Sequence, residues 1–233
     1  MTDDDDLEPV DDSPPNTDPP EALTSLVLIR HGESVANANR LVGGPRSCRG
    51  LSGAGREQVE ALGRRLKATG EAAGAVLMSS HFRRAIETAS IVGAATGLGE
   101  PIVDEGFGEL DPGEECDGLS FDEFVRRYGR PEWPGDPTQA VFPGGETIAE
   151  LSARVVETLH RVVANHPGRV IFVGTHGGVV DAAVRHAVGA PVAGGFDLWT
   201  SNASLTGLTY MPWDHWRVDR YNDSAHLIEG MAP

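Results

Sequence analysis

Short runs of apolar residues alternate along the chain with longer segments in which apolar residues recur every three or four positions. The short runs are typical of strands buried on both faces of a sheet, and the longer segments of helices that bury one face. Strands are predicted at 24–29, 75–78, 102–103 and 170–173, helices at 51–69, 82–95, 121–128, 147–165 and 177–188, and a closing β-hairpin at 204–210 and 216–221. Because strands alternate with helices, we expect an α/β domain of three layers, with a mostly parallel central sheet flanked by helices.

The N-terminal segment departs from this pattern. Residues 1–22 contain nine Asp or Glu residues, no Lys or Arg, and few large apolar side chains. Such a segment buries too little surface to offset the entropy lost on ordering, so we expect a disordered, acidic and proline-rich tail there. Residues 23–233 are expected to form a single domain.

Charge and cysteine usage limit the classes of partner and compartment. The formal net charge is −16, and outside the tail 26 acidic residues face 19 basic ones. An acidic body disfavours nucleic acid or an anionic membrane as the main partner, whereas a local arginine cluster can still bind a small phosphorylated substrate. We expect a cytoplasmic protein, because the chain has no apolar run of about 18–20 residues and no signal-peptide pattern. Its two cysteines, Cys48 and Cys116, do not form the paired framework that is more usual in secreted domains. The sequence gives no indication of the oligomeric state.

Candidate chemistry lies where two predicted strands end. Arg30, His31 and Gly32 follow the first strand, and His176 and Gly177 follow the strand at 170–173. In this fold class, functional groups gather at the carboxyl ends of strands. A single histidine is more often structural than catalytic, but two in equivalent positions are hard to explain by packing alone.

An arginine at the end of a buried strand indicates an anionic partner. A guanidinium is costly to bury alone and is suited to bidentate phosphate binding, although a buried salt bridge would also explain Arg30. Gly32 and Gly177 allow the backbone to approach a ligand closely, and the helix after Gly177 offers free N–H groups. A third strand-to-helix turn contains Arg83 and Arg84, and the residues alone do not decide which of the two faces the site.

The segments at these turns resemble the histidine phosphatase superfamily, the phosphoglycerate-mutase-like proteins. Residues 30–34 read RHGES, similar to the RHGE/T signature, and 175–178 read THGG, similar to an S-H-G-G element. Residues 80–89 resemble the S-P-L-x-R-A-x-x-T-A segment, and 142–147 the P-G-G-E-S segment. The order and spacing match from about residue 26 to 221, and the alignment selects Arg84 over Arg83.

The resemblance implies a metal-independent phosphatase that needs no cofactor. Arg30 and Arg84 would bind phosphoryl oxygens, and their charge would keep His31 neutral, so that it attacks phosphorus and forms a phosphohistidine. His176 would hold a phosphoryl oxygen from the other side. Water would then hydrolyse the intermediate.

Other site residues follow from the same resemblance. Glu109 is expected to be the general acid, with Asp111 as the alternative and a solvated loop carboxylate as the non-catalytic explanation for either. Ser34 and Asn37 are expected near the phosphate, although an ordinary turn amide would also explain Asn37. The sequence beyond Asp111 departs from the family, since 113–118 read GEECDG where a G-x-W-E-G element is usual. No spacing of histidines or cysteines indicates a metal site.

Two alternatives to a phosphatase remain at this stage. A 2,3-bisphosphoglycerate-dependent phosphoglycerate mutase is disfavoured because 41–50 lack the G-W-x-D segment of those enzymes. A non-catalytic protein that binds a phosphorylated ligand would be favoured only if a core residue were missing. The substrate stays open: Arg40, Arg46 and Arg49 would suit a second anionic group or simply be solvated, and Phe121, Trp133 and Phe142 would line the pocket or pack the segment around it.

Overall fold

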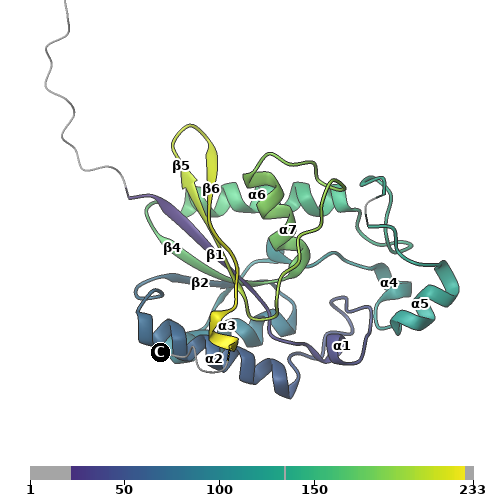
Figure 1. Ribbon diagram of the computed structural model, residues 1–233, viewed down its shortest axis with the longest axis horizontal. Helices are drawn as coiled ribbons and strands as arrows, with labels where there is room; N and C mark the ends of the chain where they lie inside the picture. The colour runs from purple at the N-terminus through teal and green to yellow at the C-terminus, as the bar shows by residue number, and fades with distance from the viewer. Residues whose placement is uncertain (1–21, 134, 229–233) are drawn as a thin grey trace, which may run out of the picture.

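The computed structural model of the protein describes residues 22–133 and 135–228, and a six-stranded sheet forms its centre (Figure 1). The strand order is β3-β2-β4-β1-β5-β6. The strands are β1 (Thr24–Arg30), β2 (Val76–Ser79), β3 (Ile102–Val103), β4 (Val170–Thr175), β5 (Leu205–Met211) and β6 (His215–Asp223). The expected tail at 1–22 lies outside the described residues except for Ala22.

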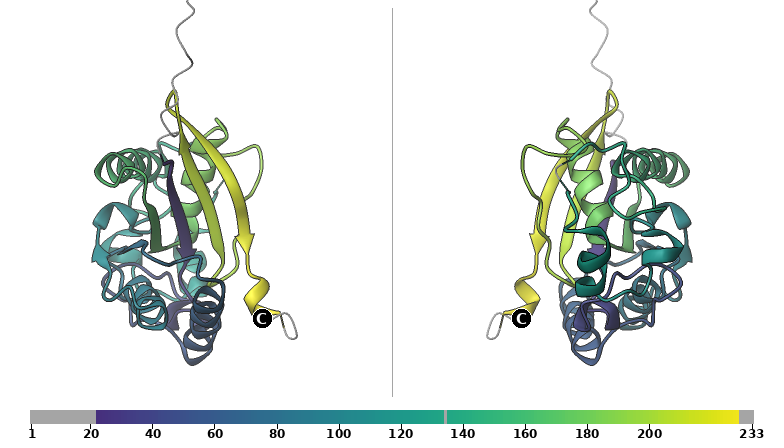
Figure 2. Two further views of the ribbon diagram at one scale, coloured as in Figure 1. Left: turned by 90° about the vertical axis from the view of Figure 1, so that its left-hand side faces the viewer. Right: turned by 90° about the vertical axis from the view of Figure 1, so that its right-hand side faces the viewer.

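The sheet is mostly parallel, as predicted. β1 pairs with β4 in parallel, and β2 pairs in parallel with both β4 and β3. β5 runs antiparallel to β1 and forms the expected hairpin with β6, which stands along one edge of the sheet in Figure 2. The predicted strands and long helices are all present, with ends displaced by a few residues.

Helices cover both faces of the sheet and so make three layers. α6 (Ile148–Asn165) and α7 (Gly177–Ala187) pack on one face, and α2 (Gly53–Thr69) and α3 (Arg83–Thr96) on the other (Figure 1). β1 shows why: Leu26 and Leu28 belong to the core on the α6–α7 side, whereas Val27 and Ile29 belong to the core on the α2–α3 side. A strand with two buried faces reads as a continuous apolar run, which explains the sequence pattern.

Short elements fill the connections. α1 (Val35–Ala38), α4 (Gly113–Cys116), α5 (Phe121–Tyr128) and the 3-10 turn η1 (Glu105–Phe107) lie beside the carboxyl end of the sheet, and a second 3-10 turn, η2 (Ala225–Leu227), lies against α2. Of these, only α5 was predicted, because four residues are too few to show a helical period. Ser52 caps α2 as expected, accepting a hydrogen bond from the Gly55 amide at 3.0 Å.

The loop after β1 is held against α2 by direct backbone contact. A side chain at Gly55 would place its Cβ 1.9 Å from the carbonyl oxygen of Glu33, and one at Gly32 would place its Cβ 2.4 Å from the carbonyl oxygen of Gly55. Only glycine permits this approach. The close packing fixes where the chain leaves the sheet immediately beyond His31.

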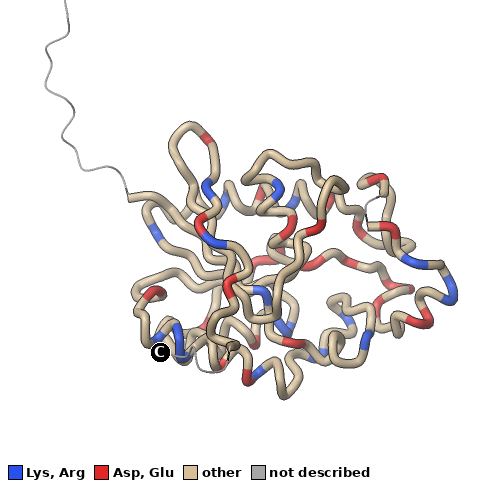
Figure 3. Tube along the Cα trace, viewed as in Figure 1, with Lys and Arg blue, Asp and Glu red and all other residues tan. Residues whose placement is uncertain are grey.

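None of the described helices combines the length and hydrophobicity needed to cross a membrane. Basic residues are interspersed with acidic ones along the trace rather than gathered in one segment (Figure 3). The carboxyl ends of β1, β2 and β4 are aligned in the sheet. In the register of the sheet, Arg30 lies opposite Thr175, and Ser79 lies opposite Gly174, so the residues that follow β1, β2 and β4 meet at one edge.

Candidate active site

His31 lies at this edge with its reactive nitrogen defined by two contacts. The side chain is 4% exposed. Its Nδ1 lies 2.7 Å from the carbonyl oxygen of Gly32, and the Nε–H of Arg84 donates to its Nε2 at 3.1 Å. Since a carbonyl only accepts and an Arg N–H only donates, Nδ1 carries the proton and Nε2 carries the lone pair.

Arg84 connects the two histidines. It stands in the first turn of α3, 4% exposed, and its Nε also lies 3.3 Å from Nδ1 of His176. Its Nη1 donates to the carbonyl oxygen of Gly43 at 3.1 Å. Arg83, by contrast, is exposed and pairs with Glu87 at 2.9 Å, so the choice that the residues alone left open falls on Arg84.

His176 is fully buried behind this arginine. Its Nε2 lies 2.8 Å from Oγ of Ser80, the residue after β2, and its ring stands edge-on to that of His31 at 5.2 Å between centroids. Burial, together with the charge of Arg84, lowers the pKa of both His31 and His176 well below the ordinary histidine value. Both rings are therefore held neutral, as expected for a nucleophile and its support.

Arg30, the last residue of β1, lies directly before His31 and has hydrogen-bonding capacity to spare. Its Nη1 donates to the carbonyl oxygen of Thr200, while its Nε is buried without a partner among the described residues. Desolvation lowers the pKa of Arg30, which nevertheless stays a cation in proteins. A partly buried cation whose Nε–H is buried and has no partner among the described residues is suited to an anionic ligand.

A cavity of about 480 Å³ opens in front of these groups. Seven of the nine residues expected at the site line it, namely Arg30, His31, Ser34, Asn37, Arg84, Glu109 and Gly177. Gly32 and His176 do not: Gly32 packs against α2, and His176 reaches the cavity only through Arg84. Among the described residues, no cluster of three or more His, Cys, Asp or Glu side chains could hold a metal ion, and both cysteines are free thiols.

Ser34 and Asn37 join the cavity through the cap of α1. The Asn37 amide donates to Oγ of Ser34 at 3.0 Å, and the Ser34 amide donates to Oδ1 of Asn37 at 3.2 Å. This reciprocal pair is a capping box. The turn-forming role considered for Asn37 is thus present, and its side chain lines the cavity as well.

Glu109 lines the same cavity from the segment after η1. The Gly178 amide in the first turn of α7 donates to its Oε2 at 3.2 Å, and the Leu110 amide donates to its Oε1 at 3.0 Å. Asp111 does not line the cavity, and its Oδ1 accepts from the Gly113 amide at 2.9 Å. Of the two carboxylates, only Glu109 has access to a ligand.

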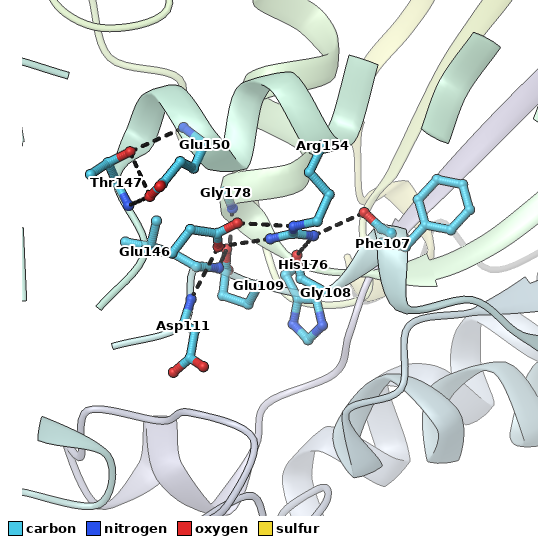
Figure 4. Close-up of polar contacts among 12 residues, drawn as sticks. Phe107, Gly108, Glu109, Asp111, Glu146, Thr147, Glu150, Arg154, His176 and Gly178 are labelled. Atoms are coloured by element: carbon cyan, nitrogen blue, oxygen red, sulfur yellow. Dashed lines mark hydrogen bonds and ion pairs between the residues drawn. The ribbon is translucent and has the colours of Figure 1, made fainter. Parts of the chain in front are cut away.

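The position of Glu109 depends on Arg154, for which no role was predicted from the sequence. Arg154 donates from Nη1 to the carbonyl oxygens of Gly106 and Gly108 at 2.9 and 3.0 Å, and forms a two-bond pair with Glu146 (Figure 4). These bonds hold the chain directly before Glu109. Arg154 belongs to α6 and Glu146 precedes it, so no local spacing could have connected either with η1. Ser80 was similarly missed, although its place directly after a buried strand was a usable signal.

An α/β fold whose cavity is lined by His31, Arg30 and Arg84, with the neutral His176 buried behind Arg84, defines the class to which this protein is assigned. The chain belongs to the histidine phosphatase superfamily (branch 1), whose family model matches residues 26–224. The resemblance read from the motifs is thereby confirmed.

Named relatives cover nearly the whole chain. It is 31% identical over 207 residues to phosphoglycerate mutase-like protein 4 of Arabidopsis thaliana, covering 88% of this chain and 87% of the relative. It is 28% identical to the metal-independent phosphoserine phosphatase of the same plant, covering 88% and 84%. The solved structure of a mycobacterial glucosyl-3-phosphoglycerate phosphatase with VO3 superposes with a TM-score of 0.73 at 27% identity, covering 85% of this chain and 99% of that one. The likeness includes phosphatases and mutase-like proteins.

Proposed function

We propose that the protein is a metal-independent phosphomonoester hydrolase that acts on a small phosphorylated metabolite through a phosphohistidine intermediate. One observation carries the proposal. The Nδ1–H of His31 is engaged by the Gly32 carbonyl, so the Nε2 lone pair lies at the cavity beside the guanidinium of Arg84. A neutral imidazole next to a cation is poised to attack an anionic phosphoryl group.

In the first step the arginines bind the phosphoryl group. The free N–H groups of Arg30 and Arg84 take its oxygens and offset their charge. Nε2 of His31 gives up its hydrogen bond with Arg84 and attacks phosphorus in line, the P–N bond forms, and the bond between phosphorus and the alcohol oxygen breaks. His176 supports this step by holding Arg84, whose Nε lies 3.3 Å from its ring.

Glu109 supplies the proton that the departing alcohol oxygen requires. In the second step its carboxylate accepts a proton from water, whose oxygen attacks phosphorus and breaks the P–N bond. Inorganic phosphate and neutral His31 result. The amide of Gly178 and the grip of Arg154 on the preceding chain keep Glu109 in place.

Two considerations support a reaction without a metal. The two arginines already provide the positive charge that phosphoryl transfer needs, and a relative that is 28% identical carries the name of a metal-independent phosphoserine phosphatase. The arginines also approach the phosphate by hydrogen bonds with fixed geometry.

The test compares wild type with His31→Asn and with His215→Asn, a matched change of an exposed histidine on β6. Phosphate release from p-nitrophenyl phosphate and a metabolite panel is measured in EDTA, and the intermediate is trapped in alkali and identified by phosphorus NMR. We expect EDTA-resistant release and a phosphohistidine signal in wild type and His215→Asn, with both abolished in His31→Asn.

A parallel assay addresses the alternatives. Isomerisation of 3-phosphoglycerate that depends on 2,3-bisphosphoglycerate would assign the protein to the mutases. Phosphate binding by a folded wild type that never forms phosphohistidine would indicate a non-catalytic ligand-binding protein. Loss of activity in EDTA that is restored by a divalent cation would overturn the metal-independent mechanism.

A further inference from the structure

Beyond its phosphate end, the cavity is walled mainly by apolar side chains. These come from the segments around α1, α5 and α6, and include Leu41, Leu110, Phe121, Trp133, Phe142 and Leu151. Trp133 stands edge-on to Phe142 at 5.7 Å, and Phe142 in turn packs on Phe124 at 5.1 Å. The ring of Trp133 is still 48% exposed, so a ligand can cover it. Phe121, Trp133 and Phe142 were expected either to line the pocket or to pack the segment around it. Trp133 and Phe142 do both, since they pack together and also line the cavity.

Only one further cation lines the cavity within the described chain, and it is already engaged. Arg185 on α7 is 5% exposed. Its Nε pairs with Asp181 at 2.7 Å, its Nη1 donates to the carbonyl oxygens of Pro191 and Gly194 at 3.0 Å each, and its Nη2 donates to that of Phe196 at 2.5 Å. Arg185 thus fixes the segment after α7 and has little capacity left for a ligand.

The arginines considered for a second anionic group are not at the cavity. Arg40, Arg46 and Arg49 are absent from its walls as described, although the adjacent Leu41, Val42 and Gly43 belong to them. Arg40 is solvated and lies 3.9 Å from Asp122. The explanation by solvated surface positions fits these arginines.

Acidic side chains line the cavity, where a substrate with a second anionic group would need a second cation. Asp181 lies one helical turn beyond Gly177, about 6 Å along α7, and Asp197 lies on the segment that Arg185 holds. Both line the cavity. Burial raises the pKa of Asp181, and the negative charge of Asp197 raises it further. Asp197 has no ion-pair partner among residues 22–133 and 135–228.

On the basis of the proposed phosphatase activity, we infer that the site selects phosphate monoesters whose alcohol part is apolar and either uncharged or cationic. Asp197, together with Asp181, discriminates against substrates that carry a second anionic group. The apolar wall receives the body of the alcohol by removing both surfaces from water. A carboxylate or second phosphate would meet the charge of Asp197, which has no ion-pair partner among the described residues, and the Asp181–Arg185 pair, whose cation is already engaged by backbone carbonyls. Discrimination of this kind comes from the repulsive element as much as from the attractive one.

Three alkyl monoesters with comparable leaving groups test this inference. 2-Phenylethyl phosphate is apolar, glycerol 3-phosphate is polar and carries no second anion, and 3-phosphoglycerate carries a carboxylate. We expect wild-type kcat/KM to fall in that order, by about tenfold or more from first to last. Asp197→Lys should raise kcat/KM for 3-phosphoglycerate by about tenfold and Asp197→Asn by about threefold, with a much smaller change for 2-phenylethyl phosphate.

Matched variants separate the two components. Trp133→Ala should lower kcat/KM for 2-phenylethyl phosphate by about five- to tenfold and leave that for glycerol 3-phosphate nearly unchanged. Glu60→Gln, an exposed charge change on α2, should alter none of the ratios. Asp197 is itself exposed, so its variants should fold, and their melting temperatures would verify this.

The outcomes distinguish this inference from the function on which it rests. Hydrolysis that depends on His31 but favours 3-phosphoglycerate, or a substrate ratio that Asp197→Lys does not change, overturns the inference and leaves the phosphatase standing. Absence of His31-dependent release from all three esters and from p-nitrophenyl phosphate overturns both.

Discussion

The Nε–H of Arg84 lies 3.1 Å from Nε2 of His31 and 3.3 Å from Nδ1 of His176. One guanidinium therefore touches both histidines and fixes the lone pair of each. Because Arg84 remains charged, it opposes protonation of either ring. This relationship joins the proposed nucleophile, its support and the phosphate-binding charge in one unit.

Arg84→Lys should lower kcat for phosphate release by about 10²–10³-fold, because an ammonium cannot donate from the Nε position to both rings while binding phosphate. Steady-state kinetics on p-nitrophenyl phosphate would measure the loss. Arg83→Lys is the matched control: its side chain is exposed and paired with Glu87, so kcat should stay within about twofold of wild type. Equal losses in the two variants would contradict the role assigned to Arg84.

Glu109→Gln should affect poor leaving groups most. An amide cannot protonate a departing alkoxide, so we expect kcat to fall by about 10²–10⁴-fold on an alkyl phosphate but far less on p-nitrophenyl phosphate, whose leaving group needs little protonation. Asp111→Asn should change the ratio between the two substrates little, because Asp111 does not line the cavity. A leaving-group effect in Asp111→Asn instead of Glu109→Gln would reassign the general acid.

Stability should fall as the pH drops below about 6.5, the ordinary histidine pKa. Burial lowers the pKa of His31 and His176 well below that value in the folded state. Between the folded and unfolded pKa values the unfolded chain binds more protons, so the free energy of unfolding decreases with falling pH by up to about 1.4 kcal/mol per pH unit for each histidine. Above that range both states are neutral and these two groups contribute no slope.

Chemical denaturation at pH 5.0, 5.5, 6.0, 7.0 and 7.5 would measure this slope. In His31→Asn, one of the two buried imidazoles is removed, so the decline below pH 6.5 should be shallower than in wild type. An unchanged slope in that variant would show that folding does not lower the pKa of His31.

Gly55→Ala should destabilise the protein by about 2–4 kcal/mol, because its Cβ would lie 1.9 Å from the carbonyl oxygen of Glu33 and force α2 away from the loop after β1. Activity should fall as well, since this loop follows His31. Gly53→Ala, two residues earlier in α2, meets no atom within 4 Å and should leave stability unchanged or slightly higher. Thermal and urea unfolding of the pair would check both expectations.

The layered architecture and most of the candidate site follow from local patterns in the sequence. Short apolar runs such as 24–29 are typical of strands inside a covered sheet, and RHG and THG segments directly after two such runs predict that Arg30, His31 and His176 lie at one sheet edge. Because parallel strands bring their carboxyl ends to the same edge of the sheet, these local patterns are enough to predict that the three side chains lie close together. The family resemblance added the choice of Arg84, which the contacts to both histidines support.

The remaining features of the candidate site come from contacts between residues far apart in the chain. The bonds from Arg154 to the carbonyls of Gly106 and Gly108 join residues more than 40 positions apart. The cavity is lined both by Trp133, which precedes α6 in the chain, and by Asp197, which follows α7. Four-residue helices such as α1 and α4 lack a period to detect. Which groups face a common space follows from how the elements pack, and side-chain contact across the chain leaves no local pattern in the sequence.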